Sequence, residues 1–337
     1  MTSTVQDVRR EQGTPPLVHV PRLEGVDDAA AWLAGARAFV REEVRRSGCL
    51  MLRGLPMVAP GDFALLRDEV MGEKAAYKEK ATPRSAYGDD VYSSTDLPPA
   101  QAIRLHNENS YTLDFPGLLL FCCLTAPEQG GVTTVGDMRA MYASVPRELR
   151  DRFEAQGWIL TRNYSDFVGM PWRKAFSTDD RSEVERYCEQ NLIGFEWLDG
   201  DGLRTWQRRP AVIRHPATGE KVWFNHVAFW SRWSLDEDVR EVLIDSYGED
   251  GLPFDTSFGD GTPLSAGEAA ALNEAYEAVT LRRTWEPGDL LLVDNIMCAH
   301  GRDAFQGERK ILVAMGEPVA LADCAPSVQP AAPAIGA

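Results

Sequence analysis

The sequence has little positive charge and no long apolar segment. Its 337 residues include 35 Lys and Arg against 51 Asp and Glu, which gives a net charge of −16 at pH 7. Nucleic-acid-binding proteins need a basic face that displaces counterions from the phosphate backbone. The longest apolar run, "GLLLFCCL", is far too short to span a bilayer, and the first residues contain no apolar stretch of signal-peptide length. These absences argue against nucleic acid or a membrane as a partner and predict a cytoplasmic protein.

Cysteine and histidine are also scarce. The six cysteines form no CxxC pair and have no regular spacing, and Cys122 and Cys123 are adjacent inside an apolar run. We therefore expect buried free thiols rather than a disulfide framework or a structural zinc site. Only five histidines are present. One of them, in the segment "RLHNENSY", lies two positions before a glutamate, and this pair raises the question of a metal site.

The remaining composition is that of an ordinary globular protein. Hydrophobic residues make up 44% and charged residues 26% of the chain, so a large buried core is available and a mostly disordered chain is excluded. No internal repeat and no clear linker divides the sequence. We therefore predict a single domain over residues 16–320, a flexible N-terminus over 1–15, and a disordered, Pro- and Ala-rich tail over 321–337.

Local patterns change from helical to β-rich along the chain and predict a mainly β protein with flanking helices. Ser265 and Glu268 form a capping box for a helix that ends near residue 279. Residues 81–99 have no period and predict a long loop that acts as a lid or binding element. The other predicted elements are helices over 27–47, 61–71, 138–144 and 146–157, a hairpin over 211–227, and strands over 49–55, 281–286, 290–300 and 309–319.

Three side chains form a candidate metal site. In an extended strand, His106 and Glu108 lie two positions apart and point to the same face. His300 ends the apolar run 290–300 and precedes a glycine, which would leave its ring at the mouth of a sheet. Two imidazoles and one carboxylate form the facial triad of non-haem Fe(II) sites, which leaves coordination positions open. Zinc accepts the same three ligands, so the triad alone does not identify the metal.

Four segments resemble, in order, a known enzyme family over roughly residues 90–316. They are "LHNENSY", "FCCLTAPEQGGVTTVGD", "HPATGEKVWFNH" and "WEPGDLLLVDNIMCAHGRDAFQGERKILVAM". Together they are similar to the Fe(II)/2-oxoglutarate-dependent dioxygenases of the TauD/TfdA superfamily, and most similar to the branch of syringomycin-biosynthesis-type hydroxylases. This resemblance implies a double-stranded β-helix core, the jelly roll also found in cupins, and O₂ as the oxidant. It implies that His106, Glu108 and His300 bind iron and that Thr133 and Arg309 bind the co-substrate 2-oxoglutarate.

The chemistry of 2-oxoglutarate agrees with these implied co-substrate residues. One end of this dicarboxylate chelates the metal together with its keto oxygen, and the other end needs a fixed cation. Arginine binds a carboxylate through two parallel hydrogen bonds and stays charged when it is desolvated, and a threonine hydroxyl adds one donor. Arg302 is the alternative to Arg309, but a position two residues after His300 leaves little room for a whole 2-oxoglutarate.

The carboxylate in the triad favours oxygenation. Halogenases of this superfamily have a small residue in place of the acid, whereas this sequence has Glu108. Many members have aspartate there, and glutamate is similar to amino-acid β-hydroxylases and clavaminate-synthase-like members. The resemblance therefore implies hydroxylation of an amino acid or amino-acid-derived intermediate, free or tethered to a carrier protein, in natural-product or antibiotic biosynthesis. Desaturation, epoxidation or cyclisation by the same centre, a zinc-dependent hydrolase and a non-catalytic binding protein remain open alternatives.

Polar and aromatic residues in four short segments are candidates for substrate contact. We would test His226 first, because its ring can orient the substrate or another group of the site. His19, His215 and most of the nine tryptophans are expected to be structural. The candidate substrate residues are Tyr92, Ser94, Asn109, Tyr111, Asn163, Asn225 and His226.

Overall fold

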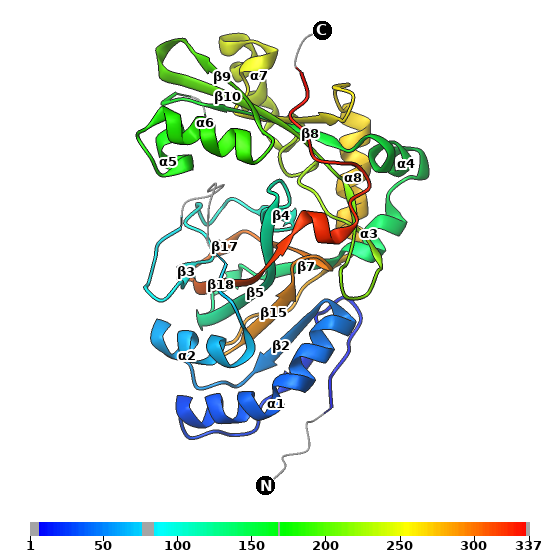
Figure 1. Ribbon diagram of the computed structural model, residues 1–337. Coiled ribbons are helices and arrows are strands. Elements are labelled where there is room, and N and C mark those ends of the chain that lie inside the picture. Colours follow the sequence, from blue (N-terminus) through cyan, green and yellow to red (C-terminus); the bar gives the residue numbers. More distant parts are fainter. Residues whose placement is uncertain (1–6, 76–83, 168, 335–337) are drawn as a thin grey trace.

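The computed structural model describes residues 7–75, 84–167 and 169–334, and two sheets form its centre (Figure 1). The larger sheet has the strand order β1-β2-β15-β5-β18-β3, and the smaller sheet has the order β14-β7-β16-β4. The larger sheet contains β1 (Leu17–His19), β2 (Cys49–Arg53), β3 (Tyr92–Ser93), β5 (Asp114–Thr125), β15 (Leu290–Asp294) and β18 (Lys310–Ala320). The smaller sheet contains β4 (Ile103–His106), β7 (Thr133–Asp137), β14 (Thr280–Leu281) and β16 (Cys298–Arg302). The predicted jelly-roll core is confirmed.

Alternate residues of β5 explain how the larger sheet is buried on both faces. Leu118 and Leu120 pack in the cluster that contains the buried residues of α1 (Val26–Ser47) and α2 (Pro60–Val70). Leu119 and Phe121 point the other way, into the cluster that also contains residues of β7 and β16. Because successive side chains of a strand face opposite sides, this apolar run supplies both the interior of the roll and the contact with the helices.

The two N-terminal helices cover the outer face of the larger sheet (Figure 1). Both lie where the sequence predicts them, and α1 ends at Gly48, which has a φ of 77°. A Cβ at Gly48 would lie 2.5 Å from Cys298 Sγ, so both the left-handed backbone and the close packing favour glycine there. The helix end thus packs directly against β16.

A third sheet, which the sequence analysis did not predict, is inserted between α4 (Arg147–Gln156) and α8 (Ala266–Ala278). This inserted sheet has the order β13-β8-β10-β9 and packs with three helices above the jelly roll (Figure 1). Polar residues interrupt its strands, as in "GLRTWQRR" of β10, so neither a continuous apolar run nor a regular alternation marks them in the sequence. The elements of this region are β8 (Trp158–Tyr164), α5 (Trp172–Phe176), α6 (Arg181–Gln190), β9 (Gly194–Leu198), β10 (Gly202–Arg209), α7 (Glu237–Tyr247) and β13 (Phe254–Phe258).

The shorter predicted elements are partly confirmed. The capping box is present, with Glu268 N donating to Ser265 Oγ at 3.2 Å and Ser265 N to Glu268 Oε2 at 2.8 Å. The helices α3 (Met138–Ser144) and α4 lie as predicted, and the hairpin pairs β11 (Val212–Arg214) with β12 (Lys221–Trp223). The short strands β6 (Gln129–Gly130) and β17 (Phe305–Gln306) also pair.

Two predicted strands are wrong in their limits. Residues 281–286 contribute only Leu281 to a strand, and the run 290–300 divides into β15 and β16, which belong to different sheets. His300 therefore lies in the middle of β16 and not at the end of a strand. Asp294, with its Oδ1, accepts the N–H groups of Ile296 and Met297, which stabilises the turn between the two strands.

The chain ends are more ordered than the sequence predicts. Arg9 pairs with Leu17 through backbone hydrogen bonds, so the segment 7–15 follows the larger sheet. Residues Leu321–Cys324 form a short 3₁₀ helix with two buried side chains, and Ala331 forms a bridge with Arg208 of β10. The prediction of a disordered tail is thus wrong for residues 321–334, because their backbone bonds to the inserted sheet replace bonds to water.

Residues 1–6 and 335–337 of the predicted flexible ends, and residues 81–83 of the predicted loop, lie outside the described residues. All six cysteines are free and buried, as predicted. In the part of the chain that the structure describes, no helix is long and apolar enough to cross a membrane.

Candidate metal centre and co-substrate pocket

Three ligand-type side chains converge between β4 and β16. These strands are antiparallel neighbours, and His106 and His300 are directly paired in their register. The two rings lie 4.4 Å apart between centroids, and His300 Nε2 lies 3.5 Å from Glu108 Oε2. The ligand atoms of all three residues lie within 4.8 Å of one another. Glu108 belongs to the turn after β4 and not to the strand, so the turn, rather than strand alternation, brings its carboxylate to the histidines.

The protonation of these side chains suits a divalent metal. His106 Nδ1 lies 2.9 Å from the carbonyl of Arg104, so this nitrogen donates and Nε2 keeps its lone pair. Burial lowers the pKa of His106 to about 3, which keeps the ring neutral. Burial raises the pKa of Glu108, but the charge of Arg84 and the hydrogen bond with His300 outweigh this effect and hold it below its usual range. A neutral His106 imidazole and an ionised Glu108 carboxylate are therefore present together, as metal binding requires.

The donor set also leaves room for other ligands. His300 Nδ1 is buried and has no hydrogen-bond partner among the described residues. In the described ranges, no fourth His, Cys, Asp or Glu joins this group. Structural zinc sites have four protein ligands, whereas non-haem iron oxygenases have this open set of three. The residues fit Fe(II) with open coordination positions.

Asn295, which the sequence analysis did not single out, holds the turn that carries Glu108. This fully buried side chain accepts a bond of 2.7 Å from Glu108 N and donates one of 2.9 Å to Glu108 O. The side chain also donates to the carbonyl of Pro116 at 2.7 Å, and the backbone carbonyl of Asn295 accepts from Asn107 Nδ2 at 2.7 Å. Asn295, in the turn between β15 and β16, thus fixes the backbone of the metal-ligand candidate Glu108.

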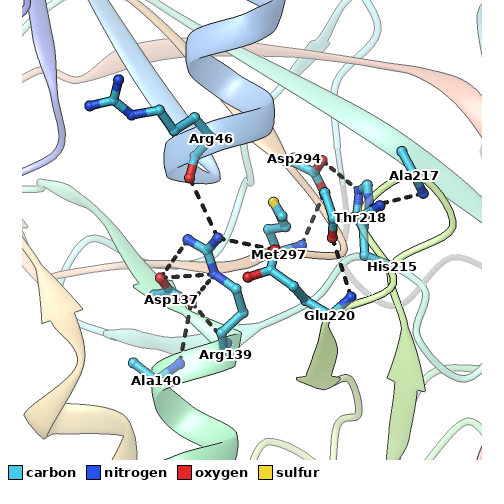
Figure 2. Close-up of polar contacts among 10 residues, drawn as sticks. All are labelled: Arg46, Asp137, Arg139, Ala140, His215, Ala217, Thr218, Glu220, Asp294 and Met297. Atoms are coloured by element: carbon cyan, nitrogen blue, oxygen red, sulfur yellow. Dashed lines mark hydrogen bonds and ion pairs between the residues drawn. The ribbon is translucent and has the colours of Figure 1, made fainter.

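His215 bonds to Asp294, which belongs to the same turn between β15 and β16 (Figure 2). Its Nδ1 accepts the backbone N–H groups of Ala217 and Thr218, both at 3.2 Å, so Nε2 carries the proton and donates to Asp294 Oδ2 at 3.0 Å. Asp294 directly precedes Asn295. The structural role expected for His215 agrees with these contacts.

Arg84 contacts the triad directly. Its Nη2 donates to Glu108 Oε2 at 2.9 Å, and both side chains are almost fully buried. The sequence offered no signal for this residue, since it lies in an aperiodic segment far from the motifs. Its positive charge helps to keep Glu108 ionised.

Next to the triad lies a small cavity that reaches Arg309. Its lining residues are Arg84, Ser94, Thr95, Ile103, His106, Phe121, Thr133, His300, Gly301, Arg302 and Arg309. Arg309 donates to Gly131 O at 2.9 Å, to Ser94 Oγ at 3.0 Å and to Thr133 Oγ1 at 3.3 Å. Burial and the nearby charge of Arg302 lower its pKa to about 9. A partly buried cation without a carboxylate partner among the described residues favours an anionic ligand in this cavity.

The two candidate arginines differ in their partners. Arg302 donates to the carbonyls of Leu97, Pro98 and Gln101 at 3.2, 2.8 and 2.6 Å, so three of its five N–H groups hold the loop before β4. Arg309 also uses three of its five N–H groups, but two of its partners are the hydroxyls of Ser94 and Thr133, which line the cavity. The identity of the partners, and not the number of free donors, therefore favours Arg309 over Arg302 as the carboxylate-binding residue.

Comparison with known proteins places the chain in a family. The model of the taurine catabolism dioxygenase TauD, TfdA family matches residues 14–315. The chain belongs to the TauD/TfdA dioxygenase family. It is 33% identical to the dapdiamide synthesis protein DdaC of Enterobacter agglomerans over 83% of this chain and 85% of that protein. It is 27% identical to a clavaminate synthase-like protein of Arabidopsis thaliana, over 81% and 82% of the two chains.

Solved structures agree with the fold. An alpha-ketoglutarate-dependent taurine dioxygenase homologue from Burkholderia xenovorans has a TM-score of 0.54 and 16% sequence identity, and 99% of each chain is covered. The family is one of oxidoreductases that use iron and 2-oxoglutarate, so these are the cofactors of this dioxygenase. This assignment favours the oxygenase over the zinc-dependent hydrolase and the non-catalytic binding protein.

The rings of His226 and Phe229, here called the aromatic wall, pack against the ring of His106. The His106 ring lies 4.7 Å from Phe229 and 5.3 Å from His226. His226 Nδ1 lies 2.6 Å from Ser110 Oγ, and its ring lies 5.1 Å from Tyr111. Burial is the main cause that keeps the pKa of His226 well below its ordinary value. Of the candidate substrate residues, His226 therefore packs against a metal-ligand candidate, and Tyr111 packs against His226. Phe229 was not anticipated.

Other candidate substrate residues are engaged within the protein. Asn163 donates to the carbonyls of Asp250 and Leu252 at 2.7 and 2.6 Å and accepts from Arg204 Nε at 3.0 Å. Asn225 donates to Ala211 O and accepts from Val227 N, both at 3.0 Å. These internal bonds favour a structural role for the two asparagines, and substrate contact at either residue stays a prediction.

The last three candidates lie in three different surroundings. Ser94 accepts a hydrogen bond from Arg309 and lines the cavity beside the triad. Tyr92 belongs to β3 and packs against the core of the roll. Asn109 has a φ of 54°, its carbonyl accepts from Thr112 N at 3.0 Å, and its Oδ1 accepts from the Tyr111 hydroxyl at 3.5 Å. Substrate contact at these three residues stays a prediction.

Proposed function

We propose that this dioxygenase hydroxylates an amino acid or an amino-acid-derived intermediate in natural-product biosynthesis, in the cytoplasm. The observation that carries the proposal is the open triad of His106, Glu108 and His300, with a cavity that leads from it to the guanidinium of Arg309. In this proposal the three residues bind Fe(II), and Arg309 with Thr133 binds the distal carboxylate of 2-oxoglutarate. Arg302 instead holds the loop 97–101.

The residues of the chain position the reactants and keep water out. Bound iron and 2-oxoglutarate supply the oxidising chemistry, in which O₂ is reduced, 2-oxoglutarate is converted to succinate and CO₂, and a substrate C–H bond is oxidised. His106 is oriented by the carbonyl of Arg104, and Glu108 by Asn295. The burial of Glu108 and His300 limits the access of bulk water to the reacting centre. The aromatic wall of Phe229 and His226 gives the substrate a surface on which one carbon is presented to the metal.

The substrate class is supported by two features. The triad contains glutamate where many family members have aspartate, as in the amino-acid-modifying members that the sequence resembles. The relatives at 33% and 27% identity are a dapdiamide synthesis protein and a clavaminate synthase-like protein. Both names fit the modification of an amino-acid-like compound. We retain the syringomycin-type branch, carrier tethering of the substrate, and antibiotic biosynthesis as parts of this proposal.

The test is a succinate-release screen with Fe(II), ascorbate and 2-oxoglutarate. Free amino acids and carrier-bound aminoacyl thioesters are the two substrate sets, and product mass is measured in parallel. Substrate-dependent succinate with a gain of one oxygen supports hydroxylation or epoxidation, and a loss of two hydrogens supports desaturation or cyclisation. No succinate above the uncoupled background with either set contradicts the proposed substrate class.

A further inference from the structure

The hydroxyl of Thr133 lies between two groups that can only donate hydrogen bonds. Trp285 Nε1 donates to Thr133 Oγ1 at 3.2 Å, and Arg309 Nη2 donates to the same oxygen at 3.3 Å. Thr133 and Trp285 are buried, with 4% and 3% of their surfaces exposed. Neither an indole nor a guanidinium can accept a bond in return. The direction of both bonds is therefore fixed by chemistry.

This arrangement determines where the hydroxyl proton of Thr133 points. A hydroxyl has two acceptor lone pairs and one proton. With both lone pairs used by Trp285 and Arg309, the proton is left to donate to a third group. No acceptor for it is present among the described residues, and Thr133 lines the cavity between the triad and Arg309. The hydroxyl thus faces the cavity as a donor.

We propose that Trp285 is a positioning residue of the co-substrate pocket, which fixes the Thr133 hydroxyl as a donor to the distal carboxylate of 2-oxoglutarate. This inference rests on the proposed co-substrate roles of Thr133 and Arg309. Without the indole N–H, the hydroxyl proton rotates among several positions, and in some of them a lone pair faces the carboxylate. Affinity for 2-oxoglutarate then falls although no group that touches it is removed.

A packing role for Trp285 has to be separated from this positioning role. Its ring belongs to the core cluster of the roll, together with Leu291, Val293 and Val135. Trp285→Phe keeps an aromatic ring in this cluster and removes only the N–H donor and part of the ring. Trp233→Phe is the matched control, because Trp233 also donates through its indole, at 2.8 Å to the carbonyl of Leu264, outside the co-substrate cavity.

The experiment is an anaerobic titration of the Fe(II)-loaded protein with 2-oxoglutarate, followed by its visible charge-transfer absorption. We expect Trp285→Phe to raise the Kd for 2-oxoglutarate by roughly 3- to 10-fold, with unchanged iron content, while Trp233→Phe leaves the Kd unchanged. Thr133→Val removes the hydroxyl at constant shape and should raise the Kd at least as much. In the Thr133→Val background, Trp285→Phe should add no further loss.

Additive losses in the double variant, or an unchanged Kd in Trp285→Phe, would overturn the inference. If Trp285→Phe does not fold, site-specific replacement of Trp285 by benzothienylalanine keeps the ring shape without the N–H, and the same Kd shift is expected. The co-substrate proposal fails separately, if neither Thr133→Val nor Arg309→Gln changes the Kd. If those two variants weaken binding and the Trp285 variants do not, only the role of Trp285 is wrong.

Discussion

The jelly roll and the inserted sheet contribute to the site in different ways. The metal-ligand and co-substrate candidates lie on or next to β4, β7, β16 and β18, and backbone pairing holds these strands in register. The inserted sheet has its own backbone pairing and side-chain bonds such as those of Asn163, and none of its strands supplies a metal-ligand candidate. The candidate metal centre thus belongs to the core of the jelly roll.

The segment 225–230 connects the two regions. Phe229 and His226 face His106, whereas Trp230 packs against Phe254 of β13, with ring centroids 4.8 Å apart. Thr256 Oγ1 of β13 donates to Val227 O at 2.9 Å. Because this segment touches both the metal ligands and the inserted sheet, the inserted sheet affects the substrate side of the site through it. We therefore expect that mutations in the two regions affect oxidation and substrate choice separately.

The largest effect is expected from the metal-ligand candidates in the jelly roll. His106→Ala and His300→Ala each remove one of three ligands, so we expect loss of iron retention and of turnover. Metal analysis after desalting and succinate release measure the two effects. His19→Ala, in the first strand of the larger sheet, is the control and should retain both. Near-normal activity in either ligand variant would contradict the assigned centre.

The second largest effect is expected from Arg309, the candidate residue for binding 2-oxoglutarate. Arg309→Gln removes the cation and should raise the Kd for 2-oxoglutarate roughly a hundredfold or more, since a charge-assisted bidentate pair is worth a few kcal/mol. Iron content should not change. Arg302→Gln is the control, and its main effect should be on stability, because it leaves three carbonyls of the loop 97–101 without their donor. A reversed outcome would assign the co-substrate to Arg302.

The third effect concerns the connecting segment. His226→Asn should raise the KM for substrate by about tenfold, the effect of one lost contact of about 1.4 kcal/mol, while the Kd for 2-oxoglutarate stays constant. Ser110→Ala, which removes only the partner of the His226 ring, should give a smaller change of the same kind. Steady-state kinetics with a substrate found in the screen measures this. A variant that loses 2-oxoglutarate affinity instead would move His226 to the co-substrate side.

The two regions were also unequally predictable from the sequence. Local patterns predicted a mainly β protein, and the resemblance of four motifs to the family implied the jelly roll, while the spacing of the His-Glu pair and of His300 predicted the three residues that the structure brings together. Asn295 and Arg84 were missed, since their roles come from contacts 187 and 24 residues away in sequence. The inserted sheet was missed because polar residues interrupt its strands, as in "GLRTWQRR" of β10, and its pairing between distant segments leaves no local signal.

The smallest effect on chemistry is expected in the inserted sheet. Asn163→Ala removes two donors from the carbonyls of Asp250 and Leu252 and the acceptor of Arg204, so we expect the free energy of unfolding to fall by about 2 kcal/mol. Urea denaturation measures this loss. Iron content and the Kd for 2-oxoglutarate should stay at wild-type values, because these bonds lie outside the jelly roll. Unchanged stability together with a raised substrate KM would show instead that Asn163 contacts the substrate. In that case β8 of the inserted sheet would belong to the substrate-binding part of the protein.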